Sequence, residues 1–210
     1  MKPGVICNLN LRVTEDGKIV SERTERAHSF VTNFAYMILR GMDGITNTDS
    51  RDITNTARPA APAMFYNRGD FSSTGLAGMA CVGAADVITK GIVVGSSNTA
   101  FAISQYGLQT QIANGTGAGQ LSYAAMLATP ADPSFSTPNI TSELYRDMAN
   151  NSGSAITVRE IGLKGLVQYT NSQLHPRGCS EILFARDVVA DTVVNAGQVL
   201  NVKYIFKTVV

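Results

Sequence analysis

The N-terminal segment places apolar residues at every second position. The odd-numbered positions from 5 to 13 are all apolar, and mostly polar residues stand between them. This two-residue period predicts a strand that buries one of its faces in a core. The EDGK stretch at 15–18 predicts a hairpin turn, because Asp-Gly readily adopts positive φ. A return strand to about residue 26 then completes a predicted antiparallel pair.

The C-terminal third repeats this pattern. Leu200, Val202, Tyr204 and Phe206 fall on one face of a predicted last strand. Upstream of it, we predict a strand from SELYRDMAN, a hairpin turn from NSG, the returning strand from SAITVREIGL and one more strand from SEILFARDVV. Short strands divided by Gly, Asn and Pro turns are typical of β-sandwiches and jelly rolls. We therefore predict a mainly β fold, in which residues 1–210 form a single antiparallel, jelly-roll-like β-sandwich domain.

The segment between these β regions is more varied. The apolar positions of SFVTNFAYMILR recur with a helical period, which predicts one packed helix over residues 29–40. Residues 42–90 are rich in Thr, Asn, Asp and Pro without a lasting period, and we predict a loop insertion there. A loop of that length is expected to lie against a neighbouring chain or to carry a contact function. Further strands are predicted at 92–94 and at about 120–128.

The composition favours contacts between proteins over other kinds of partner. Charged residues make up 16% of the chain, compared with about 25% in a typical soluble domain. Few charges and many small polar residues suit surfaces that lie against other subunits, where an unpaired charge is costly. The net charge is +1 without a basic run, so no nucleic-acid partner is expected. No apolar run reaches the ~20 residues of a membrane span, and no signal peptide is evident, which predicts a protein that is made and kept in a cytosol.

Nothing in the sequence predicts catalysis, a cofactor or a metal site. The three cysteines (Cys7, Cys81 and Cys179) are far apart, and the two histidines (His28 and His175) lack the context of a catalytic or metal-binding set. The glycine-rich NGTGAGQ stretch lacks the GK[ST] of a phosphate loop and predicts a turn. We therefore expect no enzyme. A hydrolase with an unmarked carboxylate pair remains an alternative, with these candidates: Asp70, Asp86, Asp132 and Glu143.

The VREIGL stretch raises a question about Glu160. On a strand, Glu160 shares a face with Ile156 and Val158, whereas the apolar residues after it lie on the other face. Either a bulge resets the register near this residue, or Glu160 is buried and needs a partner. Arg146 and Arg186 are the candidate partners, and we predict a structural ion pair.

Several segments together resemble a known class of protein. In chain order they are GIVVGSSNTAF, YGLQTQI, GQLSY, ITVREIGL, LFARDVV and VNAGQVLNVKYIFKTVV, which resemble segments of structural proteins from tailed-bacteriophage virions. The resemblance covers roughly residues 91–210, and the opening strands and FVTNFAYMIL are also similar to such proteins. These motifs are structural, and they occur in capsid-associated, neck, tail and fibre proteins alike. The 42–90 segment departs from the compact members of this class.

The resemblance implies a virion subunit that binds copies of itself and other virion proteins, after assembly in the host bacterial cytoplasm. The candidate assembly contacts are Phe65 and Tyr66 in the predicted insertion, and Asn114, Gly115 and Gly117 in the glycine-rich turn. Replacing Phe65 and Tyr66 together with Ala is expected to weaken assembly more than folding. The alternative is a receptor- or glycan-binding module of a phage tail or fibre, which would bind through loop aromatics. The tyrosines that could line a carbohydrate groove are Tyr66, Tyr106, Tyr123, Tyr145 and Tyr169, although most of them are better interpreted as strand residues that pack in the sheet.

Overall fold

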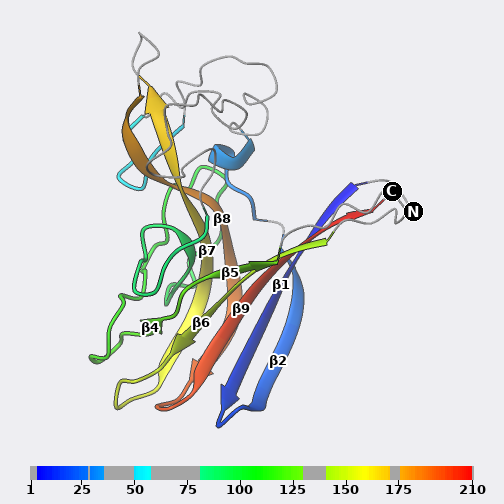
Figure 1. The fold of residues 1–210 in the computed structure, drawn as a ribbon, viewed down its shortest axis with the longest axis vertical. Helices are drawn as coiled ribbons and strands as arrows, with labels where there is room; N and C mark the ends of the chain where they lie inside the picture. The colour runs from blue at the N-terminus through cyan, green and yellow to red at the C-terminus, as the bar shows by residue number, and fades with distance from the viewer. Residues whose placement is uncertain are drawn as a thin grey trace.

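The strands of the computed structural model form two antiparallel sheets (Figure 1). The structure describes residues 4–27, 29–35, 50–57, 81–129, 141–170 and 176–209. The larger sheet has the order β2-β1-β9-β6-β4, with β5 also paired to β6, and the smaller one has the order β3-β7-β8. The strands are β1 (Gly4–Glu15), β2 (Lys18–Ala27), β3 (Gly91–Gly95), β4 (Ser122–Tyr123), β5 (Leu127–Thr129), β6 (Thr141–Ala149), β7 (Ile156–Thr170), β8 (Pro176–Val194) and β9 (Val199–Val209). The predicted mainly β, antiparallel fold is therefore confirmed.

The predicted N-terminal hairpin is also confirmed. Strands β1 and β2 pair in antiparallel register, and the turn residues Asp16 and Gly17 have φ values of 49° and 74°. Positive φ at both central positions matches the right-handed twist of the two strands, which explains why Asp-Gly stands at this point. On the other side of β1, strand β9 pairs with it along its whole length. The first and last strands of the chain are thus neighbours.

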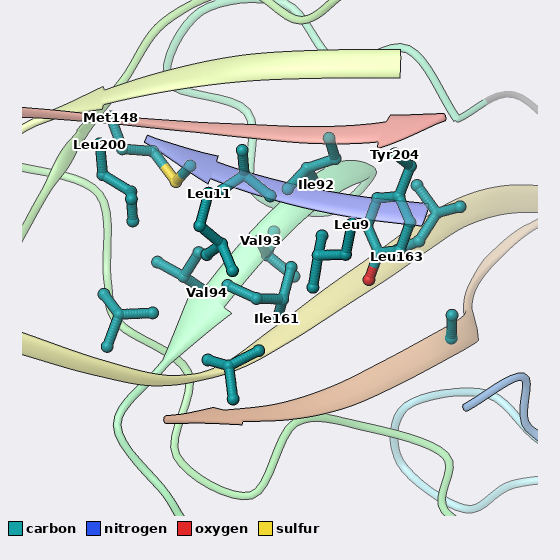
Figure 2. Packing of buried hydrophobic residues seen from close by; sticks show 14 of the residues in the cluster. Leu9, Leu11, Ile92, Val93, Val94, Met148, Ile161, Leu163, Leu200 and Tyr204 are labelled. Carbon is teal, nitrogen blue, oxygen red and sulfur yellow. The ribbon is translucent and has the colours of Figure 1, made fainter. Parts of the chain in front are cut away.

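Both sheets contribute side chains to one hydrophobic core (Figure 2). The alternating residues from Cys7 to Val13 of β1 and from Leu200 to Tyr204 of β9 are fully or almost fully buried there, as their two-residue period predicts, and Phe206 is partly buried. Figure 2 shows them beside apolar residues of β3 and β7. Each fully buried Leu, Ile or Val side chain favours folding by about 1.5–3 kcal/mol. The labelled core residues are Leu9, Leu11, Ile92, Val93, Val94, Met148, Ile161, Leu163, Leu200 and Tyr204.

The predicted hairpin between the SELYRDMAN and SAITVREIGL strands is wrong. Strand β6 pairs with β9, β4 and β5, whereas β7 pairs with β3 and β8, so the chain passes from one sheet to the other at Asn150. The buried Asn150 side chain donates to the carbonyls of Ser154 at 2.8 Å and Val194 at 2.7 Å. Turn residues encode a change of direction, and they leave open which strand becomes the neighbour.

Two further predictions need adjustment. The strand expected at 120–128 is divided into β4 and β5, which both pair with β6. In the region of the predicted helix, residues 32–35 are helical, and residues 36–40 lie outside the described part of the chain. Phe30 precedes the helical residues and forms an isolated bridge with Ala185; it stacks on Phe34 with the ring centroids 4.4 Å apart, and both rings pack against the core.

The predicted insertion at 42–90 is described only at 50–57 and 81–90, and in these two ranges the chain forms turns and an isolated bridge between Arg51 and Ala57. The carboxylate of Asp52 holds the first turn by accepting the backbone N–H groups of Thr54 and Thr56, both at 2.9 Å. No helix in the described ranges is long and apolar enough to cross a membrane.

Candidate functional site

The site is a loop of residues 96–111, called here the anchored loop, which leaves β3 and returns beside it. The backbone N–H of Ser96 donates to the carbonyl of Thr110 at 2.9 Å, and that of Ile112 donates to the carbonyl of Val94 at 2.9 Å. An isolated bridge joins Gly95 to Gln111. The two ends of the loop are therefore held together as a continuation of the smaller sheet, and the residues between them form one closed excursion.

A buried ion pair lies beneath the anchored loop. Arg186 Nε is 2.6 Å from Glu160 Oε2, and both side chains are fully excluded from solvent. The carboxylate of Glu160 also accepts the backbone N–H groups of Gln109 at 3.1 Å and Thr110 at 2.8 Å. A buried pair of this kind is tolerated only when hydrogen bonds satisfy its remaining donors and acceptors, and here the loop supplies them.

Arg186 holds a second part of the same loop. Its Nη1 donates to Gln105 Oε1 at 3.0 Å, and its Nη2 donates to the carbonyl of Thr99 at 2.9 Å. The planar guanidinium directs its donors at fixed angles, so these bonds fix the position of the loop as well as its distance from β8. Four residues of the anchored loop thus bond to one charged pair on β7 and β8.

Both possibilities considered for Glu160 occur together. The pairing of β7 with β8 shifts register between Val158 and Glu160, and Glu160 is buried with a cationic partner. Of the two candidate partners, Arg186 forms the pair.

Arg146 does not pair with Glu160, and this candidate is corrected. Its guanidinium is fully buried on β6 and donates to four backbone carbonyls at 2.8–3.1 Å, those of Ala84, Val87, Ile92 and Ala124. Its Cζ lies 4.9 Å from the centroid of the Tyr123 ring, and burial lowers the pKa of the arginine. The candidate depended on a hairpin between β6 and β7, and those strands belong to different sheets.

Gly95 allows the loop to approach the ion pair closely. A Cβ at this position would overlap the Glu160 carboxylate and would stand 2.5 Å from the Thr110 carbonyl oxygen. No residue larger than glycine fits there without moving the anchored loop, the glutamate or both.

The outer side of the anchored loop forms a polar, hollowed surface with the turn at 50–57. Two hollows of about 380 and 360 Å³ adjoin here and share Ser104, Gln105 and Tyr106. The turn is fastened to the fold because Ile53 N–H donates to the Glu181 carbonyl at 3.1 Å. Tyr106 is 38% exposed beside the hollows, and Ile103 on the same loop is 62% exposed.

No protein family matches this chain, and neither does any curated protein or solved structure. The geometry of the site and the chemistry of its residues therefore carry the functional argument. They combine a rigid base with an exposed surface, which is the usual construction of a binding loop on a scaffold.

The candidate contacts in the glycine-rich turn use their polar groups internally. Asn114 Oδ1 accepts the N–H of Tyr123 at 3.0 Å, and the N–H groups of Gly115 and Gly117 donate to the Leu121 carbonyl and to Gln120 Oε1. Gly117 is exposed, whereas Asn114 and Gly115 are half-buried. Their role in assembly stays a prediction. The candidates Phe65 and Tyr66 lie outside the described residues.

The carboxylates considered for hydrolysis are placed differently from one another. Glu143 forms an ion pair with Lys203 at 2.9 Å, and Asp86 lies in a turn with a φ of 64°. Asp70 and Asp132 lie outside the described residues, as do both histidines. Within the described ranges, no three His, Cys, Asp or Glu side chains are close enough together to hold a metal ion.

The residues that shape the anchored loop were missed by the sequence analysis. Thr99, Gln105, Gln109 and Thr110 contact the ion pair, and the sequence marked none of them as a candidate site residue. Three of these contacts use backbone atoms, which any residue type supplies. The only indication in the sequence was Glu160, whose charge falls among apolar strand residues. A carboxylate buried there needs hydrogen-bond donors from another part of the chain.

Proposed function

We propose that this chain is a structural subunit of a tailed-bacteriophage virion. It acts by self-association and by binding other virion proteins, as a capsid decoration, neck or tail component. The observation that carries the proposal is the anchored loop, which Glu160 and Arg186 hold from beneath and which exposes Ile103 and Tyr106. A preformed surface loses little conformational entropy when a partner binds, and an exposed isoleucine and tyrosine supply apolar contact area.

The segments that resemble virion proteins support this proposal because they meet at the same place. Gly95 belongs to GIVVGSSNTAF, Glu160 to ITVREIGL and Arg186 to LFARDVV, while Gln109 and Thr110 belong to YGLQTQI. Gly95 is aligned with Glu160 between β3 and β7, and Arg186 forms the ion pair. The segments that resemble virion proteins therefore contribute residues to one connected set of contacts.

The proposal includes a finer description of the fold, namely a jelly-roll-like β-sandwich. The shared core of the two sheets and their antiparallel pairing support it. We also propose that the protein catalyses no reaction, needs no cofactor, has no nucleic-acid or membrane partner, and is located in the virion after assembly in the host cytoplasm.

The first experiment is the solution mass of the purified protein across a concentration series, by size-exclusion chromatography with light scattering. A discrete oligomer that forms as the concentration rises is the expected result, and electron microscopy of that oligomer then shows whether it is a ring or another closed assembly. A monomer at every concentration would contradict self-association.

The polar hollows favour a second candidate, a glycan-binding module. Hydroxyl and amide side chains surround the half-exposed Tyr106 together with the cationic Arg51, and such a mixture of polar and aromatic groups suits a sugar ring. A glycan array tests this function directly. Binding that is lost in Tyr106→Ala, with an unchanged solution mass, would favour the glycan-binding module over the assembly subunit.

A further inference from the structure

The outer edge of β2 is an open sheet edge in the described part of the molecule. Strand β2 is the terminal strand of the larger sheet, and Figure 1 shows it at the margin with β1 on its inner side. Its side chains are largely exposed, including Ile19 at 56% and Val20 at 54%. A sheet edge presents a row of unpaired N–H and C=O groups and readily accepts another strand.

The sequence of this strand carries charges in a mirrored order. Residues 22–26 read ERTER, so that Thr24 is flanked by Arg23 and Glu25, and these in turn by Glu22 and Arg26. Alternate residues of a strand share a face. Arg23 and Glu25 lie on the half-buried face that also carries the buried Ala27, and Glu22 and Arg26 lie on the exposed face.

Two of these side chains have buried polar atoms without a partner. Among the described residues, the only buried side-chain nitrogen or oxygen atoms that lack a hydrogen bond are Arg23 Nε and Glu25 Oε1. The Nη2 of Arg23 does reach the Ala190 carbonyl on β8 at 2.7 Å, so the arginine is held in place while its Nε stays unused. Buried polar atoms of this kind are normally satisfied.

We propose that two copies of the chain pair antiparallel through their β2 edges, with a two-fold axis at Thr24. This pairing rests on the proposed self-association and names its interface. In this register Arg23 lies opposite the partner's Glu25, and Glu22 lies opposite the partner's Arg26. Directly opposite residues of antiparallel strands have Cβ atoms about 5 Å apart, which is within reach of an ion pair. The symmetry repeats each contact, and it places a side chain of opposite charge beside each of the two residues that carry an unsatisfied atom.

The charge order selects this register over its neighbours. An axis at Glu22, Arg23, Glu25 or Arg26 would place two copies of the same charged side chain opposite each other. Like charges in direct opposition are destabilising, whereas an axis at Thr24 places two hydroxyls there. The interface is isologous, so it closes after two copies.

Charge reversal on the exposed face tests the pairing. Arg26 forms no ion pair within the described residues, and Arg26→Glu places two carboxylates opposite each other at two symmetric points. We expect the dissociation constant of the β2-mediated dimer, measured by light scattering or sedimentation, to rise about tenfold. Mixing Arg26→Glu with Glu22→Arg restores opposite charges, and the mixture is expected to dimerise more tightly than either variant alone.

The matched control is Lys18→Glu, which makes the same charge change on the same strand, outside the proposed overlap at 21–27. It is expected to leave the dissociation constant unchanged. Melting temperatures of all variants show whether each one folds. Equal weakening by Lys18→Glu and Arg26→Glu would overturn the register and indicate a general charge effect.

A cysteine at the axis tests the geometry independently of charge. In Thr24→Cys, the two introduced thiols lie opposite each other across the axis, at a spacing that a disulfide spans. Mild oxidation with diamide is expected to give a covalent dimer from Thr24→Cys and little from Lys18→Cys. If Thr24→Cys still cross-links when Arg26→Glu is added, the β2 edges pair but the ion pairs do not hold them together. That result would contradict the proposal, which assigns the register to the charges.

The outcomes separate this inference from the proposed function. Oligomers that form in the wild type and are insensitive to Arg26→Glu, without cross-linking at position 24, would overturn the β2 pairing and leave self-association intact. A wild-type monomer at every concentration would overturn both.

Discussion

Glu160 and Arg186 are held together by more than their mutual attraction, because the backbone of the anchored loop donates to the glutamate and accepts from the arginine. Glu160→Gln removes the negative charge and leaves a buried guanidinium without compensation. We expect a loss of about 3 kcal/mol in the free energy of unfolding, which is typical when one partner of a buried pair is removed. Denaturant unfolding followed by circular dichroism measures it.

The exposed ion pair between Arg159 and Asp191 provides the control for this change. Its atoms are 2.9 Å apart, but the aspartate side chain is 61% exposed, so water and salt screen the attraction. Asp191→Asn is expected to leave the midpoint of unfolding nearly unchanged. Equal effects of Asp191→Asn and Glu160→Gln would show that burial does not determine the strength of the Glu160 contact.

The cysteines give a second prediction at the scale of single residues. Burial raises the pKa of Cys7 to about 12, with a further contribution from the charge of Asp187, and burial also raises the pKa of Cys81 to about 12. The reactive thiolate is therefore scarce at about pH 8. We expect iodoacetamide to label both residues far more slowly in the native protein than in denaturant, as measured by peptide mass spectrometry. Native labelling of Cys7 at the rate of a free peptide thiol would contradict its burial.

At the scale of elements, the sequence predicts the faces of strands better than their partners. The alternation in β1 and β9 identified the buried face correctly, because a two-residue period is a local property. The pairing of β1 with β9 joins the two ends of the chain, and no local pattern encodes it. The same limit produced the wrong hairpin between β6 and β7, and with it the wrong partner Arg146.

Predictions within the site divide in the same way. The conflict between the charge of Glu160 and its apolar neighbours was visible in the sequence, so its burial and its need for a cation could be anticipated. The loop contacts could not, because they come mostly from backbone atoms brought there by a loop of irregular sequence. The sequence predicted β2 as a strand but did not predict that it lies at the edge, because that position depends on the order of the whole sheet.

Gly95→Ala tests how the site depends on the packing of elements. The added methyl would overlap the Glu160 carboxylate and the Thr110 carbonyl, so the anchored loop must move away from β7. We expect a loss of roughly 1–3 kcal/mol in the free energy of unfolding, as for other overpacked sites. We also expect faster hydrogen exchange at the N–H groups of Gln109 and Thr110.

Gly153→Ala is the matched control, because a Cβ at Gly153 would have no heavy atom within 4 Å. It is expected to change neither the stability nor the exchange rates at the anchored loop. Unchanged exchange at Gln109 and Thr110 in Gly95→Ala would mean that the loop tolerates the added methyl without leaving the ion pair.

At the scale of the whole molecule, the two proposed contact surfaces lie apart. Figure 1 shows β2 at one side of the view and the loop that follows β3 at the other. An isologous contact through β2 uses up the edges of two copies, so it makes dimers and stops there. Growth into a ring or a larger assembly then requires a second surface, and the anchored loop with Ile103 and Tyr106 is the one that the structure offers.

This division of roles predicts which species remains when each surface is altered. Ile103→Ser combined with Tyr106→Ser removes the exposed apolar groups of the anchored loop, and we expect assembly to stop at the β2-paired dimer. Adding Arg26→Glu to this variant is expected to shift the remaining dimer toward monomer by the same change of about tenfold in the dissociation constant. The melting temperature is expected to stay unchanged, because all three side chains are exposed. Mass photometry over a dilution series distinguishes these species. If larger oligomers persist in the triple variant, a contact surface other than these two must hold them together, and the proposed division of roles would be wrong.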